Sequence, residues 1–392
     1  MNKINNNQKS LNPQILYVQY TNPGGYPPLQ HSSQILAQDG WKVIFLGIEA
    51  FGASALSFPS HANIEVHLMS FSRPGWIQKL HYLQFCISAL ISTLIYRNQW
   101  VYASDLLSSP VAYLLSFFPG INVVYHEHDS PDCTSNSLFI RFCLATRKWL
   151  AARAKMCVLP NQQRLEKFAS DTGIHHNLFC IWNCPSRLEA TSTRSFSQAD
   201  RLQILYHGSI VPSRLPITVL QALVMLPHTV KLRVIGYDTI GHQNYVQQLA
   251  EMAKHLKINN QVEFINAMPR YELLKWCREC DVGLGFMPIG DEDINMQCMV
   301  GASNKPFDYL ACGLALLVSD LPDWKRMYVE PGYGLACNPH DPESIAAALR
   351  WYLEHPTEMR VMGDRGRQRI LDEWNYETQF EVIKTQLSKT SI

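Results

Sequence analysis

The chain has 392 residues, about two to three times the length of a typical domain, so two domains are expected. Its 34 Lys and Arg nearly balance its 33 Asp and Glu, and the net charge of +1 excludes both the basic surface that drives nucleic-acid binding and an acidic, solvating chain. Charged residues make up only 17% of the sequence, below the roughly 25% of soluble domains, so contact with a membrane stays open.

The 11 cysteines are an odd number and are scattered along the chain, which predicts reduced thiols and a cytoplasmic protein rather than a disulfide framework. Cys277 and Cys280 form a CxxC pair. A structural zinc site would need a second pair, and the nearest candidates, Cys180 and Cys184, lie far upstream. The sequence therefore favours buried, apolar thiols over zinc.

Neither the start of the chain nor its longest apolar stretch predicts a membrane-targeting segment. Residues 1–12 are rich in Asn and are followed by no apolar core, which predicts a disordered tail rather than a signal peptide. The apolar stretch at 83–96 contains polar residues and is shorter than the roughly 20 residues needed to cross a bilayer. No transmembrane helix is predicted.

Along residues 13–185, short apolar runs rich in strand-forming residues alternate with stretches of helical periodicity. The expected strands are 15–18, 41–46, 64–68, 100–103, 122–125, 156–159 and 179–181. The expected helices are 29–38, 76–97, 110–118, 138–154 and 162–169. This alternation builds a parallel sheet with helices on both faces, so the segment is predicted to be one α/β domain.

Residues 186–200 have no apolar period and consist mostly of Ser, Thr, Arg, Ala and Gln, which predicts an exposed linker. A second domain is expected over 201–370, where the alternation resumes. Its expected strands are 202–206, 231–235, 262–265, 282–286, 315–319 and 334–336. Its expected helices are 216–225, 243–256, 270–277, a helix after Pro306, 342–355 and a final tract through 365–387. Two similar α/β domains in series are thus predicted to face each other across a cleft.

Two segments of the second domain are predicted to bind an anion. Gly208 follows an expected strand and allows close approach of the backbone, and Arg214 supplies a positive charge near the next helix. Ser303 or Asn304 can cap a short helix, where the first amides and Lys305 could bind a diphosphate. Asp308, one turn further on, could accept hydrogen bonds from ribose. A solvated loop and a surface Lys305–Asp308 pair are the alternatives.

The first domain offers two weaker candidates. His126 and His128 share one side of an extended segment and Glu127 points to the other, so a metal site, a hydrogen-bonding site and a structural strand cap all stay open. Gly24 and Gly25 after the first strand would let a substrate approach the backbone or form an ordinary rigid turn. The chain has no Walker loop, nucleophile elbow or GxGxxG fingerprint.

The order of these pieces resembles the retaining glycosyltransferases of the GT-B fold, in particular family four, over nearly the whole chain. The likeness is strongest between Val262 and Ala348. The segments that carry it are Val262-Glu263-Phe264, Tyr271-Glu272-Leu273-Leu274, Asp281-Val282-Gly283-Leu284, Lys305-Pro306-Phe307-Asp308-Tyr309-Leu310-Ala311-Cys312-Gly313-Leu314-Ala315 and Val318-Ser319-Asp320.

The resemblance implies roles for residues of the second domain and two departures from the family. Asp308 stands at the second acidic position of a paired-acid motif, which implies ribose binding, whereas Val300 replaces the first acid. Arg214 stands at the family's phosphate-binding lysine, and Ser209 stands where an arginine is common. Lys305 is expected to replace part of the missing charge.

Further roles are implied at the remaining positions of the motif. His128 resembles a histidine that contacts the donor sugar near the reacting carbon. Ala267 and Met268 belong to a loop whose backbone contacts the base. The other expected substrate-binding residues are Gly24 and Gly25 near the acceptor and phosphate, Gly208, and Ser303 and Asn304 near the donor sugar. Residues 371–392 are expected to form a helix that returns to the first domain.

By this resemblance the chain is an enzyme that transfers a sugar from a nucleoside-diphosphate sugar to an acceptor hydroxyl, with retention and without a cofactor or an obligatory metal. The expected role is synthesis of a glycan, polysaccharide or glycolipid. The alternatives are a non-catalytic GT-B protein that binds a nucleotide sugar or a partner and, less favoured, a sugar-nucleotide epimerase. The helix at 76–97 is either a core helix or a peripheral contact with the inner face of a membrane, where a lipid-linked acceptor would lie.

Overall fold

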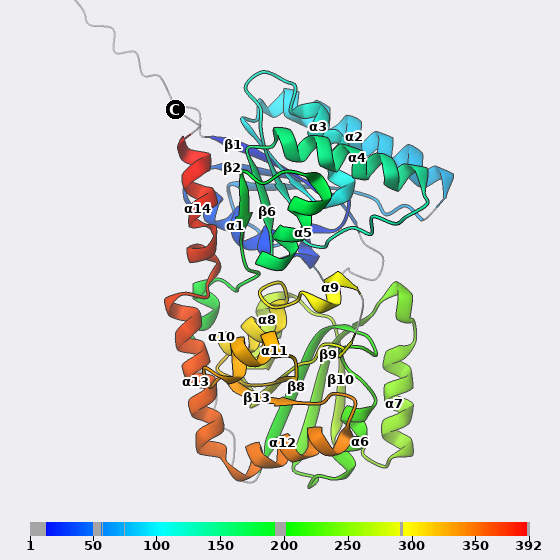
Figure 1. Cartoon of the computed structure of the whole chain (residues 1–392), viewed down its shortest axis with the longest axis vertical. Coiled ribbons are helices and arrows are strands. Elements are labelled where there is room, and N and C mark those ends of the chain that lie inside the picture. Colours follow the sequence, from blue (N-terminus) through cyan, green and yellow to red (C-terminus); the bar gives the residue numbers. More distant parts are fainter. Residues whose placement is uncertain are drawn as a thin grey trace, which may run out of the picture.

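The computed structural model describes residues 13–49, 56, 58–73, 75–192, 201–290 and 293–389. These residues form two α/β domains of similar build, each around one sheet (Figure 1). The tail expected at 1–12 and the stretch 193–200 of the expected linker lie outside the described residues. The two sheets lie on either side of that linker, whereas the exact domain bounds stay a prediction.

The first sheet has seven parallel strands in the order β3-β2-β1-β4-β5-β6-β7. The strands are β1 (Gln14–Val18), β2 (Lys42–Ile48), β3 (Ile64–Met69), β4 (Trp100–Ser104), β5 (Asn122–His126), β6 (Met156–Leu159) and β7 (Leu178–Cys180). The helices that alternate with them are α1 (Pro27–Gln38), α2 (Trp76–Tyr96), α3 (Ser109–Leu115), α4 (Leu138–Arg153) and α5 (Gln162–Thr172), with short 3-10 turns at Pro23–Gly25 and Leu106–Ser108.

The second sheet has six parallel strands in the order β10-β9-β8-β11-β12-β13. The strands are β8 (Leu202–Ile210), β9 (Val230–Asp238), β10 (Val262–Asn266), β11 (Val282–Gly285), β12 (Ala315–Ser319) and β13 (Gly334–Cys337). The helices are α6 (Thr218–Val224), α7 (Tyr245–His255), α8 (Arg270–Cys277), α9 (Ile294–Gln297), α10 (Asn304–Ala311), α11 (Pro322–Trp324), α12 (Pro342–Glu354), α13 (Pro356–Asp372) and α14 (Tyr376–Lys389). Short turns of other helix types lie at Arg187–Ala190, Ile240–His242 and Lys325–Val329.

Each sheet is covered on both faces, as the continuous apolar runs of its strands predict. In β1, Leu16 and Val18 belong to one core cluster, and Ile15 and Tyr17 belong to the cluster on the opposite face. The second sheet likewise separates two clusters of buried side chains. The α/β alternation expected from the sequence is therefore confirmed.

Strand order reverses direction once in each sheet, between β1 and β4 and between β8 and β11. Loops that leave neighbouring strands at such a point run to opposite faces of the sheet, which opens a crevice at the carboxyl ends of the strands. The residues expected to bind ligand lie at or after the ends of β1, β5, β8 and β10 and at the start of α10, so the topology brings segments of both domains to one place.

The carboxyl-terminal tract joins the two domains. We expected one helical tract through 365–387, but the structure has two helices, with α13 on the second domain and α14 along α1 of the first (Figure 1). The chain breaks between them because Trp374 is buried in the second-domain core and Asn375 caps α14, with its Oδ1 accepting the backbone N–H of Thr378 at 3.0 Å.

Strand β8 is longer than the sequence predicts. Strand β8 was expected to end at Tyr206, yet it stays paired with β9 as far as Ile210, so Gly208 lies within the strand with a φ of 99°. Helix α6 begins at Thr218 rather than at the expected residue 216, and Arg214 lies in the turn that precedes it, near the helix as expected. The strand continues because Gly236 lies opposite Gly208, where a Cβ would collide with the Gly208 carbonyl.

Helix α14 is predicted to stabilise the first domain. Phe380 is 1% exposed and packs in the cluster that contains β1 and α1, so Phe380→Ala should destabilise the protein by about 3–5 kcal/mol. Val382 lies on the same helix and is 43% exposed, so Val382→Ala should change stability by less than about 0.5 kcal/mol. Urea unfolding of both variants measures the difference, and equal midpoints would contradict the packing of α14.

Candidate functional site

A cavity of about 370 Å³ lies between the two domains at the carboxyl ends of both sheets. It contains nearly every residue that the sequence analysis selected. Those residues are Gly24, Gly25, His128, Gly208, Ser209, Arg214, Met268, Ser303, Asn304, Lys305 and Asp308. The exception is Ala267, which lines a neighbouring cavity beyond Tyr237, a residue that borders both.

Arg214 and Lys305 are the two cations without a carboxylate partner in the cavity. Arg214 Nη1 donates to the Ser209 hydroxyl at 3.3 Å, and Lys305 Nζ lies 5.6 Å from the centre of the Tyr206 ring. Among the described residues, neither cation lies within ion-pair distance of a carboxylate. Burial and the nearby Arg214 lower the pKa of Lys305 to about 7. The pair thus forms a positive region that an anion would relieve.

Gly208 is required where Lys305 approaches the strand. A Cβ at residue 208 would lie 3.3 Å from Lys305 Cε and 3.4 Å from Nζ, and the φ of 99° disfavours other residues. Gly24 lies in the 3-10 turn Pro23–Gly25, in agreement with the rigid-turn alternative. There a Cβ would meet the Leu56 carbonyl oxygen, so the glycine admits a neighbouring stretch of backbone at the cavity wall.

Helix α10 points its amino terminus at the same cavity. Ser303 takes the cap position in an extended conformation, and Gly313 follows the end of the helix with a φ of 76°. The first amides of a helix have no acceptor within the helix, and its dipole favours a negative charge there. Because Ser303, Asn304 and Lys305 all line the cavity, this helix start adds to the anion site.

Asp308 is buried in an ion-pair network rather than exposed in a surface pair with Lys305. Arg270 donates to both of its carboxylate oxygens, at 2.6 and 3.1 Å, and also to both oxygens of Glu189, at 2.6 and 3.0 Å. His207 Nε2 lies 3.4 Å from Asp308. Burial raises the pKa of Asp308 against the opposing effect of Arg270. For Glu189, burial acts in the same direction, but Arg270 and His31 lower its pKa to about 2.

His128 is held by its backbone at the end of β5. Its N–H donates to Asp105 Oδ1 at 2.8 Å, and its carbonyl accepts from Arg164 Nη1 at 2.7 Å. Its ring packs 5.1 Å from the Tyr26 ring and 4.0 Å from the His126 ring. Burial lowers the pKa of His128 to about 3, so the imidazole is neutral near pH 7.

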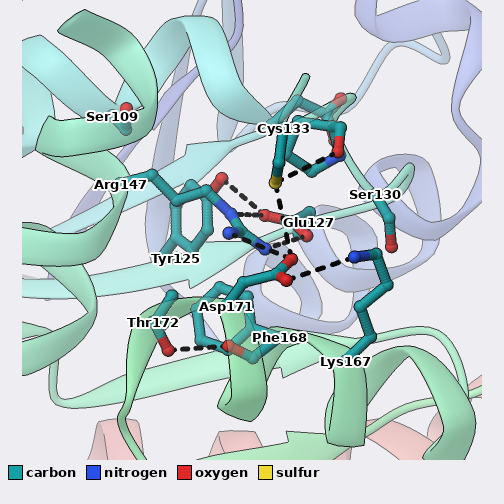
Figure 2. A network of polar contacts seen from close by, with 12 residues as sticks. Ser109, Tyr125, Glu127, Ser130, Cys133, Arg147, Lys167, Phe168, Asp171 and Thr172 are labelled. Atoms are coloured by element: carbon teal, nitrogen blue, oxygen red, sulfur yellow. Dashed lines mark hydrogen bonds and ion pairs between the residues drawn. The ribbon is translucent and has the colours of Figure 1, made fainter. Parts of the chain in front are cut away.

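The side chain of Glu127 points away from the two histidines, as the alternation along the strand predicts. Figure 2 shows it in a bidentate pair with Arg147, whose Nε and Nη2 donate at 2.5 and 2.8 Å, while Tyr125 donates to the same carboxylate. Asp171 joins the network from α5. This buried pair fixes the strand end behind His128, which supports a structural role for Glu127. Within the described ranges, no three His, Cys, Asp or Glu side chains gather as metal ligands would.

Several cavity residues were not found from the sequence. Among them are the polar residues Arg164, Asn183, Tyr237 and Arg270. Arg270 opens α8 directly after the loop expected to contact a base, so its position was a usable signal. Arg164 and Asn183 form hydrogen bonds across the domain boundary, and no local sequence pattern reveals such contacts.

All eleven cysteines lie within the described residues and carry free thiols.

The chain is similar to one protein-family model over part of its length and to solved structures over nearly all of it. Residues 218–385 match the family model described as glycosyl transferase-like. No curated protein sequence matches the chain. The structure of Anabaena HepE in complex with UDP and glucose is similar with a TM-score of 0.70 and 16% identity, covering 96% of this chain and 100% of that one.

Two other solved structures show the same architecture. Sucrose-phosphate synthase from Thermosynechococcus elongatus has a TM-score of 0.69 and 14% identity, covering 96% of this chain and 98% of that one. WaaG, a glycosyltransferase involved in lipopolysaccharide biosynthesis, has a TM-score of 0.62 and 13% identity, covering 95% of this chain and 99% of that one. The expected GT-B fold and the resemblance to group 1 glycosyltransferases are confirmed.

Affinity for a nucleoside diphosphate should depend on the charge of Lys305. Its lowered pKa of about 7 means that the ammonium is charged at pH 6 and largely neutral at pH 8 in the free protein. Bound anion favours the charged form, so the affinity for UDP should fall by up to about tenfold per pH unit above pH 7. Calorimetric titration at pH 6, 7, 8 and 9 measures this. Lys305→Arg stays charged throughout, so its profile should show only the titration of UDP itself, and the fall above pH 7 should remain in the difference between the wild type and this variant.

Proposed function

We propose that this chain, a glycosyl transferase-like protein of the GT-B fold, is a glycosyltransferase that moves a sugar from a nucleoside-diphosphate sugar to an acceptor hydroxyl with retention of configuration. The observation that carries the proposal is the convergence of Arg214, Lys305 and the start of α10 on one cavity between the domains. Two unpaired cations at a helix start fit a diphosphate. The similarity to HepE, whose structure holds UDP and glucose, supports the same ligand class here.

In the proposed step, the bond between the anomeric carbon of the sugar and the β-phosphate oxygen breaks, and its electron pair stays on that oxygen. The acceptor oxygen forms the new bond to the anomeric carbon on the same face. The acceptor's proton passes to the leaving diphosphate, which serves as the base. Arg214, Lys305 and the α10 amides stabilise the charge that develops on the diphosphate, through groups oriented before the reaction begins.

Asp308 and His128 position the rest of the donor in this proposal. Asp308 is held in place by Arg270 and faces the cavity, so it is suited to accept hydrogen bonds from ribose hydroxyls. The neutral His128 lies on the first-domain wall and is suited to contact the sugar near the reacting carbon. Because Arg214 and Lys305 supply the charge that a divalent cation would otherwise bring, the proposed reaction uses no obligatory metal.

The first domain presents a surface that suits an acceptor carried by a membrane. Large apolar side chains on α2 recur every three or four residues on one exposed face. They are Trp76, Ile77, Leu80, Leu83, Ile87, Ile91, Leu94 and Ile95, each at least 46% exposed. Helix α4 adds exposed Leu138, Phe142 and Trp149. The opposite side of α2 packs in the first-domain core through Phe85 and Ala89, as the core-helix alternative expects. The extent of the exposed apolar face supports an additional role as an interaction surface.

The charges around this surface favour an anionic membrane. Helices α2 and α4 contain no Asp or Glu, whereas Lys79, Arg141 and Lys148 lie on them. Apolar residues combined with basic ones are the pattern of helices that lie on anionic lipid. No helix in the described part of the chain is both long and apolar enough to span a bilayer. We therefore propose peripheral contact through α2 and α4, and a role in the synthesis of a glycan, polysaccharide or glycolipid.

Arg214→Ala should slow sugar transfer at least tenfold, because loss of one group that stabilises the leaving charge typically costs about 2.7–4 kcal/mol. A thermal-shift screen with UDP, GDP, ADP and their common sugars first selects the donor. Turnover of that donor is then measured for the wild type, Arg214→Ala and Arg214→Lys, with the melting temperature as the control for folding. Unchanged turnover in Arg214→Ala would remove the assignment. Nucleotide binding without transfer or donor hydrolysis would favour a non-catalytic protein.

Binding to membranes is tested by flotation with phosphatidylglycerol vesicles. The wild type should float with them and should float less with neutral phosphatidylcholine vesicles. Ile87→Glu combined with Leu94→Glu should abolish flotation, because two charges enter the apolar face. Val224→Glu, at an exposed apolar position on α6 of the second domain, is the matched control and should float as the wild type does. Wild-type protein that stays at the bottom of the gradient would exclude this contact.

A further inference from the structure

The segment that leads into α10 is held by the other domain. Residues 295–302 comprise the end of α9 and the link toward α10, and five of their backbone carbonyls accept hydrogen bonds from the first domain or from the segment that follows β7. The carbonyls are those of Asn295, Cys298, Val300, Gly301 and Ala302. These bonds lie directly before Ser303, Asn304 and Lys305, which line the cavity.

Arg164 on α5 provides the central contacts. Its side chain is 2% exposed, and its guanidinium donates to Cys298 O at 3.1 Å and to Asn295 O at 3.1 Å in the second domain. The same group donates to His128 O at 2.7 Å in its own domain. A buried guanidinium is costly unless its donors are satisfied, and this one is satisfied only when both domains are in place.

Asn161 and Asn183 complete the attachment. Asn161 caps α5 through Oδ1, which accepts the Arg164 N–H at 2.9 Å, while its Nδ2 donates to Cys298 O at 2.8 Å and to Val300 O at 3.0 Å. The backbone N–H of Asn183 donates to Gly301 O at 2.8 Å, and its Nδ2 donates to Ala302 O at 2.7 Å. All of these donors belong to α5, to its cap or to the segment after β7, so the five carbonyls turn toward the first domain.

We propose that Arg164 and Asn161 are positioning residues that set the direction of the α10 amino terminus and the place of His128 together. A shift of α5 relative to the second domain would move the carbonyls before α10 and the backbone of His128 at once. The anion site and the histidine are therefore held in one mutual arrangement by the contact between α5 and residues 295–302. This inference rests on the proposed function for its effects on UDP affinity and kinetics, but not for its effect on how the two domains are held together.

The test compares three substitutions within one turn of α5. Asn161→Asp keeps the helix cap and replaces the Nδ2 donor with an oxygen that faces two carbonyls. Arg164→Met removes the guanidinium and keeps an unbranched apolar side chain. Gln163→Ala is the matched control. Gln163 Nε2 also donates to the second domain, to Asp323 Oδ2 at 3.0 Å, but this hydrogen bond is exposed to solvent. For each variant, calorimetry gives the Kd for UDP, transfer assays give kcat and KM, and small-angle X-ray scattering gives the radius of gyration.

Asn161→Asp and Arg164→Met should each raise the Kd for UDP at least fivefold, lower kcat at least tenfold and increase the radius of gyration, at an unchanged acceptor KM. Gln163→Ala should stay within twofold of the wild type. A merely structural role would lower the melting temperature without changing the Kd of the folded protein. Unchanged Kd and scattering in both variants would overturn the proposal. If the wild type neither binds UDP nor transfers sugar, the proposed function fails, and the scattering of the variants alone decides whether these residues hold the domains.

Discussion

The cleft depends on positive charge that the protein itself does not neutralise. Arg164 and Arg270 are paired with carboxylates of the protein, at Asp129 in one case and at Asp308 and Glu189 in the other. Arg214 and Lys305 have no such partner among the described residues. Lys305 is buried and Arg214 is half-buried, and cations in such places are stabilised by a counter-charge, so the architecture around them suits an anion. Burial and the neighbouring Arg214 lower the pKa of Lys305, which a bound anion would raise again.

Much of the fold could be predicted because the strands and helix ends of a parallel α/β sheet have recognisable local sequence patterns. The strand Trp100–Ser104 is buried throughout and reads as an unbroken apolar run, and the glycine after Ala311 and Cys312 marks where a helix stops. The errors occurred where long-range pairing extends an element. Strand β8 runs past Tyr206 only because β9 continues beside it as far as Asp238.

The site was predictable in part for the same reason. Loops at the carboxyl ends of strands could be named in advance, and His128, Arg214 and Lys305 do meet in one cavity. Whether these residues perform the proposed chemistry stays a prediction. Arg164 could not be found from the sequence, because its importance comes from carbonyls more than 130 positions away in the chain. The partner of Asp308 was also missed: a single sequence shows an acidic residue but not the arginine that occupies both of its oxygens.

The path of α14 has a consequence for how the protein is made. Tyr376, Phe380, Ile383 and Leu387 complete a core whose other members belong to strands and helices near the start of the chain. During synthesis the amino-terminal sheet emerges first, yet the part of its face that α14 covers beside α1 stays exposed until the entire second domain has been translated. The first domain therefore lacks part of its core until α14 is made, and a chain truncated before α14 leaves an apolar surface open to aggregation or to capture by chaperones.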